Sequence, residues 1–356
     1  MSLGAPQIGV AEGGALPLPW LAAALADATA LRQAHAVLLF GPAGAGQLEL
    51  ALTLAQAALC EAPPAAGRAC GHCASCHLVR QRAHPDLLVL LPEALRVQFA
   101  WLSDDEGRLA KGEAKPSREL KVAQVREAIA WGQQTSGRGR GKVLVVHPAD
   151  ALNAAAANAL LKTLEEPPGA LRLLLTSADP ERLLPTVRSR CQRVRLALPP
   201  LAQAAAWLRE QGVAAPEPLL ALAAGSPLEA LAWAAEGVTA DWLAQLPRRV
   251  AAGDASVLAG KPLPRVIDLL LKLAHDASLQ AAGGEGRFFA PGAVPGGASL
   301  AALTVWQRVL LRAARHDEHP WNAGLLVESL VGQASGLWPA PPRTGAGRPA
   351  RAGAPG

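Results

Sequence analysis

The sequence is poor in aromatic residues and in cysteine. It has no tyrosine, one methionine and five cysteines, and aromatic residues make up 4% of its 356 positions. Binding platforms for nucleic-acid bases use exposed aromatic rings. The nine tryptophans are mostly flanked by alanine and leucine and are interpreted as core residues, so we expect no such platform. Four of the five cysteines lie between Cys60 and Cys76. That crowding is typical of a metal site rather than of the disulfide framework of a secreted protein.

Long apolar runs are also absent. No stretch reaches 18 residues without a charge or a helix breaker, so we expect no transmembrane helix. The first basic residue is Arg32, and the start therefore lacks the positive charge of a signal peptide. We expect a soluble, cytoplasmic protein. The formal net charge of +5 is spread along the chain, which permits contact with nucleic acid without arguing for it.

Strand and helix patterns alternate up to about residue 196. Short apolar runs predict strands at 37–40, 87–91, 143–146 and 171–176, and helical spacing appears at 20–34, 48–59, 122–131 and 154–164. Such alternation predicts an α/β domain with a parallel sheet covered on both faces. Residues 92–118 are mixed and polar, typical of a surface insertion. After residue 200 only helices, split by glycine and proline, are expected.

The length predicts two or three domains. We divide the chain into a flexible N-terminus, an α/β domain containing the cysteine cluster at 60–76, two successive helical domains and a disordered tail. The corresponding residues are 1–18, 19–196, 197–240, 241–337 and 338–356.

The turn after the first predicted strand resembles a phosphate-binding P-loop. Gly41 and Gly46 match G-x-x-x-x-G-K-[ST], with Gly44 between them, but Gln47 stands in place of the lysine and Leu48 in place of the hydroxyl. The backbone could still attract an anion. Without the ammonium group and the metal ligand, however, we do not expect hydrolysis. An ordinary glycine-rich turn is the alternative.

The strand at 143–146 gives a second, independent indication. His147 and Pro148 occupy the positions where a working P-loop ATPase carries a magnesium-binding aspartate and often a glutamate base. Imidazole is a poor ligand for Mg²⁺ and proline has no acid. Asp150 lies too far along the chain to replace them. The residues at 147 and 148, like those at 47 and 48, therefore predict that this chain does not hydrolyse ATP.

Four thiols within 17 residues predict a zinc site. The spacing Cys60-x₉-Cys70-x₂-Cys73-x₂-Cys76 supplies a closed tetrahedral shell with no open position, which is a structural site rather than a catalytic one. A redox-active Cys-x-x-Cys pair and unligated thiols are the alternatives.

Residues 143–193 carry the most distinctive pattern. They contain NALLKTLEEPP at 158–168 and LPTVRSRC at 184–191. Considered without the surrounding sequence, Arg190 is interpreted as a solvated cation at a helix end and Cys191 as a small core residue. The whole stretch resembles the sliding-clamp-loader branch of the AAA+ ATPases, and the cysteine cluster is similar to that of its bacterial members. The likeness extends over about residues 20–335 and includes HPWN at 319–322.

The resemblance implies a non-hydrolysing (stator) subunit, because the ATP-hydrolysing gamma/tau motor of these loaders keeps an intact ATP site. It implies that Arg190 is an arginine finger donated in trans to ATP on the neighbouring gamma/tau subunit, with Ser189 and Cys191 positioning it. Residues 19–196 would then be the AAA+ domain, 197–240 its helical lid, and 241–337 a collar domain for oligomerisation.

The partners implied by the resemblance are the gamma/tau and delta subunits. The beta sliding clamp and primer-template DNA would be reached through the assembly, as part of a DNA-directed DNA polymerase holoenzyme, without a membrane. The implied cofactor is a structural Zn²⁺, and ATP is not expected to be hydrolysed by this chain. The alternatives are an ATP-hydrolysing motor, and a zinc-knuckle DNA-binding protein built on an inactive ATPase scaffold.

Two further groups of charges are expected to have no special role. Arg138, Arg140 and Lys142 could face DNA, but we expect a solvated loop. Glu165 and Glu166 are expected at a capped, exposed helix end, and a contact with DNA or with another subunit is the alternative.

Overall fold

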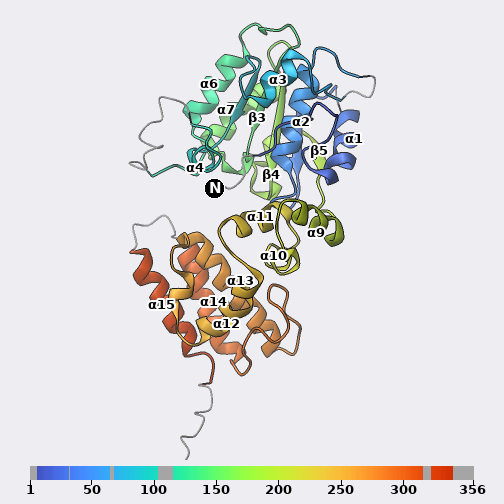
Figure 1. Cartoon of the computed structure of the whole chain (residues 1–356). Helices are drawn as coiled ribbons and strands as arrows, with labels where there is room; N and C mark the ends of the chain where they lie inside the picture. The colour runs from blue at the N-terminus through green and yellow to red at the C-terminus, as the bar shows by residue number, and fades with distance from the viewer. Residues whose placement is uncertain (1–5, 32, 65–67, 103–114, 316–321, 340–356) are drawn as a thin grey trace, which may run out of the picture. The chain divides into compact units, whose positions relative to one another are not determined.

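A computed structural model describes residues 6–31, 33–64, 68–102, 115–315 and 322–339. Its first part contains a five-stranded sheet in the order β2-β3-β4-β1-β5, with every neighbouring pair parallel (Figure 1). The strands are β1 (Ala36–Phe40), β2 (Leu87–Leu90), β3 (Lys142–Val146), β4 (Leu171–Ser177) and β5 (Gln192–Arg195). The predicted parallel α/β sheet is confirmed.

The register of the sheet places the glycine-rich turn at its carboxyl edge. Phe40 pairs with Ser177, and Val146 pairs with Leu175 on the other side of β4. The segments that follow β1, β3 and β4 therefore meet at one edge. In open α/β sheets this edge is where ligands bind.

Helices cover both faces of the sheet because its central strands are apolar on both sides. Helix α2 (Gln47–Leu59) packs against β3 and β4 on one face. Helices α6 (Val122–Gly132) and α7 (Ala154–Glu165) lie on the opposite side (Figure 1) and share a buried core with Leu171, Leu173 and Leu175 of β4. Alternate residues of β4 thus face different helices, as the pleat of a strand requires.

The first part of the chain also contains shorter elements. They are η1 (Pro19–Leu21), α1 (Ala22–Ala30), α3 (Ala74–Arg80), α4 (Glu93–Gln98), η3 (Ala149–Ala151), η4 (Pro180–Arg182) and α8 (Pro185–Arg188), followed by α9 (Leu201–Glu210), α10 (Pro216–Leu222) and α11 (Pro227–Ala235). Residues 6–18 precede η1. Within them, the backbone N–H of Val10 donates to Gln56 of α2 over 2.6 Å.

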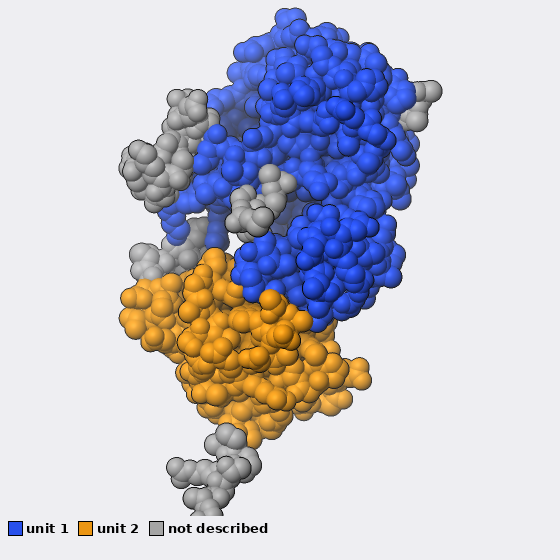
Figure 2. Space-filling view, viewed as in Figure 1, with its two compact units in different colours: residues 1–238 blue, residues 239–356 orange. Residues whose placement is uncertain are grey.

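The chain divides into two compact units, residues 1–238 and 239–356 (Figure 2). The second unit contains α12 (Ala240–Ala251), η5 (Ala255–Leu258), α13 (Leu263–Ala281), α14 (Leu300–Arg315) and α15 (Ala323–Ser335). Its core includes Trp306, whose indole N–H donates to the carbonyl of Leu330 over 3.1 Å. In the described part of this unit all regular elements are helical, as the sequence predicts.

The structure differs from the sequence prediction at several places, which include helices α3 and α8, neither of them predicted. Strand β5 was not predicted, residues 93–98 form helix α4 inside the expected polar insertion, and the expected helix 20–34 is η1 followed by the shorter α1. Residues 103–114, 319–321 and 340–356, which hold the rest of that insertion, most of the HPWN motif and most of the expected tail, lie outside the described residues.

No single helix in the described parts of the chain is long and apolar enough to cross a membrane. Helices α10 and α11 pass that test by length and composition only when they are taken together, and they are bent by 110° at their break.

Candidate functional site

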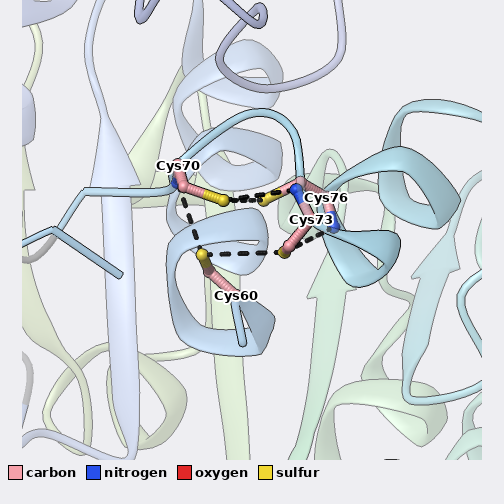
Figure 3. Close-up of side chains that lie close together, drawn as sticks. All are labelled: Cys60, Cys70, Cys73 and Cys76. Carbon is pink, nitrogen blue, oxygen red and sulfur yellow. Dashed lines mark hydrogen bonds between the residues drawn. The ribbon is translucent and has the colours of Figure 1, made fainter. Parts of the chain in front are cut away.

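The four clustered cysteines come from three neighbouring segments. Cys60 ends α2, Cys70 lies in the following loop, Cys73 caps the N-terminus of α3, and Cys76 lies within it. Figure 3 shows the four sulfur atoms facing one another. The Sγ atoms of Cys60 and Cys73 are 3.9 Å apart, those of Cys70 and Cys76 are 3.8 Å apart, and all four lie within 4.8 Å of one another.

This arrangement fits a tetrahedral metal shell. Four Zn–S bonds of about 2.3 Å at tetrahedral angles place sulfur atoms about 3.8 Å apart. Backbone N–H groups of Cys70, Cys73 and Cys76 donate to the sulfurs of Cys60, Cys70 and Cys73 over 3.3–3.4 Å. Such donors stabilise thiolates, the form that binds metal. The predicted cluster is therefore able to hold a metal ion.

The thiols of this cluster differ in acidity. Burial raises the pKa of Cys60. Burial also opposes ionisation of Cys73, but hydrogen bonds from the backbone N–H groups of Cys76 and Glu61 and from neighbouring thiols outweigh it and lower the pKa of Cys73 to about 6. Cys73 therefore supplies a thiolate near neutral pH.

A charged network joins the cysteine cluster to the basic loop before β3. Arg138 donates to Glu61 over 2.9 Å and to Ser75 over 3.0 Å, and Arg140 donates to the carbonyl of Cys60 over 2.6 Å. The buried carboxylate of Asp86 accepts the backbone N–H groups of residues 137 and 138 over 2.7 and 2.9 Å.

The expectation of a solvated loop is confirmed for Arg138 and Arg140, which are exposed, and is wrong for Lys142. Lys142 is buried as the first residue of β3, with its ammonium group 3.8 Å from Asp86. Both arginines are engaged with the segment that carries the cysteines. The partners of Arg138 and Arg140 lie 63 to 80 residues away in the sequence, which is why the local pattern could not reveal them.

The glycine-rich turn folds with its glutamine directed inward. Gly44 and Gly46 adopt positive φ angles of 72° and 100°, a conformation that glycine adopts without steric cost. The side-chain amide of Gln47 donates to the carbonyl of Gly41 over 2.7 Å and to that of Pro42 over 2.8 Å. The residue at the lysine position thus binds the turn itself.

Apolar side chains cover the same turn. A Cβ atom at Gly46 would lie 2.7 Å from a methyl group of Leu18 and 3.1 Å from one of Leu21. The indole of Trp20 donates to the carbonyl of Ala45 over 2.9 Å. Leu48, at the position of the metal-binding hydroxyl, is buried.

The segment after β3 has no charged magnesium ligand at its start. The His147 ring lies 2.7 Å from the hydroxyl of Thr176 on β4, and burial lowers the pKa of His147 to about 4. Nearby in sequence, Asp150 Oδ1 is buried and has no hydrogen-bond partner among the described residues; Ser177 Oγ at the end of β4 shares both properties.

Arg190 lies at the other edge of the sheet. Strand β5 begins at Gln192, which pairs with Val37 at the start of β1, whereas the glycine-rich turn begins after the end of β1. At about 3.3 Å per residue, the level of Val37 and the start of the glycine-rich turn are separated by about 13 Å along β1. Arg190 and the glycine-rich turn of the same chain are therefore not brought together.

The local contacts of Arg190 hold it near the surface. Its side chain is 34% exposed and forms an ion pair with Glu165 at the end of α7. It donates to Glu165 over 2.7 Å and to the carbonyl of Thr186 over 2.9 Å. Ser189 donates to the same Thr186 carbonyl over 3.2 Å. Cys191 is buried in the core, where burial raises the pKa of its thiol to about 12.

The model of the family described as DNA polymerase III, delta subunit matches residues 23–200, and the chain belongs to this family. The matched range contains the cysteine cluster, the glycine-rich turn and Arg190.

The chain is 42% identical to the DNA polymerase III subunit delta' of Pseudomonas aeruginosa strain PAO1 over 211 residues, which cover 58% of each protein. It is 38% identical to the subunit delta' of Escherichia coli K12 over 221 residues, which cover 60% of each. It is also 31% identical to the DNA polymerase III subunit tau of E. coli K12 over 239 residues, 66% of this chain and 32% of that protein. The chain thus matches less than two thirds of the length of its delta' relatives.

Proposed function

We propose that this chain is the non-hydrolysing, delta'-type stator of a DNA polymerase III clamp loader, and that Arg190 acts on ATP held by a neighbouring subunit. The observation that carries the proposal is the placement of Arg190 at the sheet edge opposite its own glycine-rich turn. An arginine so placed serves a nucleotide bound by another chain better than one bound by its own.

The state of the turn supports the absence of hydrolysis. The Gln47 amide is committed to the carbonyls of Gly41 and Pro42, where a P-loop lysine would reach the β- and γ-phosphates. Leu48 offers no oxygen to Mg²⁺, and the neutral His147 offers no carboxylate. Each of these substitutions removes a group that phosphoryl transfer requires.

The chemistry proposed for Arg190 is electrostatic. A guanidinium group stabilises the negative charge that spreads over the γ-phosphoryl oxygens in the transition state, and arginine fingers accelerate NTP hydrolysis by roughly 10³–10⁵-fold. Ser189 and Cys191 position it, Cys191 by anchoring the turn in the core. To reach a neighbour's phosphate, Arg190 must exchange its contact with Glu165 for that anion.

We extend the proposal to the domains and partners. Residues 19–196 serve as the AAA+ domain, 197–240 as its lid and 241–337 as the collar that joins the gamma/tau and delta subunits. The beta sliding clamp and primer-template DNA are contacted through this assembly in the cytoplasm. Relatives named as delta' and tau subunits support the clamp-loader role.

We propose a structural role for zinc at Cys60, Cys70, Cys73 and Cys76. Four thiolates saturate a tetrahedral ion and leave no site for water or substrate. When bound, the ion cross-links the end of α2 to α3. The segment around Val10, which packs on the cysteines, is then fixed as well.

The decisive experiment is a loader reconstituted from this chain with gamma/tau, delta and the beta clamp. Arg190→Ala is expected to fold and assemble normally, while ATP hydrolysis stimulated by DNA and the clamp falls severely. Arg182→Ala, which removes an exposed arginine of η4, is the matched control and should leave the rate unchanged. Normal turnover by the Arg190→Ala loader would exclude the finger role.

The likeness to the tau subunit supports a second candidate, an ATP-hydrolysing motor. Saturable ATP hydrolysis by the isolated chain would favour that function. We expect none, because the turn lacks the required lysine and hydroxyl.

A further inference from the structure

A cavity of about 520 Å³ lies at the amino edge of the sheet, on the face that α2 covers. Its walls are formed by α1, the second half of α2, and the starts of β1, β3 and β4. Leu54, Ala57 and Ala58 of α2 contribute to the lining. Because two of these side chains are alanines, the helix leaves a space over the sheet instead of filling it.

Arg172 is an unusual residue for its position in this cavity. It lies on β4, between β3 and β1, on the same side of the strand as Leu174, with which it lines the cavity. Central strands of a parallel sheet are normally apolar on both faces. Arg172 is an exposed residue, and partial desolvation by its surroundings lowers the pKa of its guanidinium group.

The charge of Arg172 is uncompensated within the described residues. It forms no hydrogen bond or ion pair there, and none of the described residues that line the cavity is acidic. A second guanidinium, that of Arg140, lines the same cavity, and among the described residues its hydrogen-bond partner is the backbone carbonyl of Cys60. Both arginines are exposed residues at the cavity, and neither is paired with a carboxylate of a described residue.

We propose that this cavity binds a small organic anion with an apolar body, with Arg172 and Arg140 holding its carboxylate or phosphate group. The volume lies within the usual range for small-molecule sites, which combine apolar walls with a few placed polar groups. The guanidinium geometry suits both kinds of anion. This site is on the opposite edge of the sheet from the glycine-rich turn and does not depend on the clamp-loader proposal.

The test uses the full chain and the dye 8-anilinonaphthalene-1-sulfonate, which carries an apolar body and one negative charge. We expect saturable binding of one dye per chain. Arg172→Gln should weaken it about tenfold or more, the ratio that one charge-assisted hydrogen bond provides. Ala57→Leu should weaken it by filling the space. Arg195→Gln, which removes an exposed arginine of β5 outside the lining, is the matched control.

Competition identifies the anionic group. Displacement by decanoate indicates a carboxylate ligand, and displacement by decyl phosphate indicates a phosphate ligand. Near-ultraviolet circular dichroism must be the same for all variants, because partly unfolded chains also bind the dye. Equal dye binding by the parent and by a folded Arg172→Gln variant, or displacement by neither competitor, would overturn the proposal.

Discussion

The amide nitrogen of Gln47 lies 2.7 Å from the carbonyl oxygen of Gly41, so the glycine-rich turn is closed by its own side chain. A lysine at this position in a working P-loop points outward to phosphate. Here the side chain serves the stability of the turn instead.

Gln47→Ala is therefore expected to destabilise the protein. Loss of the amide leaves the carbonyls of Gly41 and Pro42 without that donor, which costs about 1–3 kcal/mol where the groups are buried. Urea-induced unfolding measures the change. Gln203→Ala, on the exposed face of α9, should change the free energy of unfolding far less, and equal effects of the two substitutions would contradict the structural role.

Metal analysis of the purified chain is expected to find one Zn²⁺ per molecule. The double change Cys73→Ser and Cys76→Ser should remove it and lower the melting temperature, because α2 and α3 are no longer cross-linked. The control is Cys191→Ser, which alters the remaining cysteine outside the cluster. A native chain without zinc, or a double variant that retains it, would refute the assignment.

Glu49 should make the protein less stable as the pH rises. This residue of α2 is 7% exposed, and burial raises its pKa from 4.5 to about 7. The folded state then binds the proton more tightly than the unfolded state. Stability from this group is fully present below pH 4.5 and is lost as the pH rises to about 7, by about 3 kcal/mol in total.

Glu49→Gln removes the titrating group at nearly constant shape. Unfolding free energies of the parent and of Glu49→Gln, measured between pH 4.5 and 8, should therefore diverge as the pH rises, with the variant becoming relatively more stable. Parallel pH profiles for the two proteins would show that Glu49 is not the cause.

His147 should make the protein less stable as the pH falls, the opposite of the effect of Glu49. Burial lowers its pKa from 6.5 to about 4, so the unfolded state binds the proton more tightly. Stability from this group is present above pH 6.5 and is lost as the pH falls toward 4. His147→Gln should flatten the fall in melting temperature between pH 7 and 5. His77→Gln, at an exposed histidine, should leave that fall unchanged. An unaltered dependence of the melting temperature on pH in His147→Gln would contradict the role of His147.

Much of the sheet could be predicted because its strands are short, apolar and separated by recognisable turns. Strand β5 could not, since only Val194 of its four residues is buried and the others are exposed and polar. An edge strand of this kind has neither the alternation nor the apolar run that indicates a strand. Its pairing with β1 supplies the signal that the sequence lacks.

The candidate site was predictable where chemistry is local. The spacing of the four cysteines indicated a metal site, and Gln47 and Leu48 were visible as departures from a motif. The contact between Arg190 and Glu165 was not, because 25 residues separate them and an acidic pair at a helix end is common. Arg172 did carry a signal, a cation within the run LRLLLTS, but its lack of a partner emerges only in three dimensions.

Because Arg190 and the glycine-rich turn lie at opposite edges of the sheet, the two sides of this domain are not equivalent. Subunits that each offer an arginine from one side and a nucleotide site on the other can join head to tail, as heterologous contacts do. A chain whose nucleotide side is closed can give an arginine but has no use for one. Under the proposed function, this chain occupies one end of such a row, and no further subunit of this kind is added there.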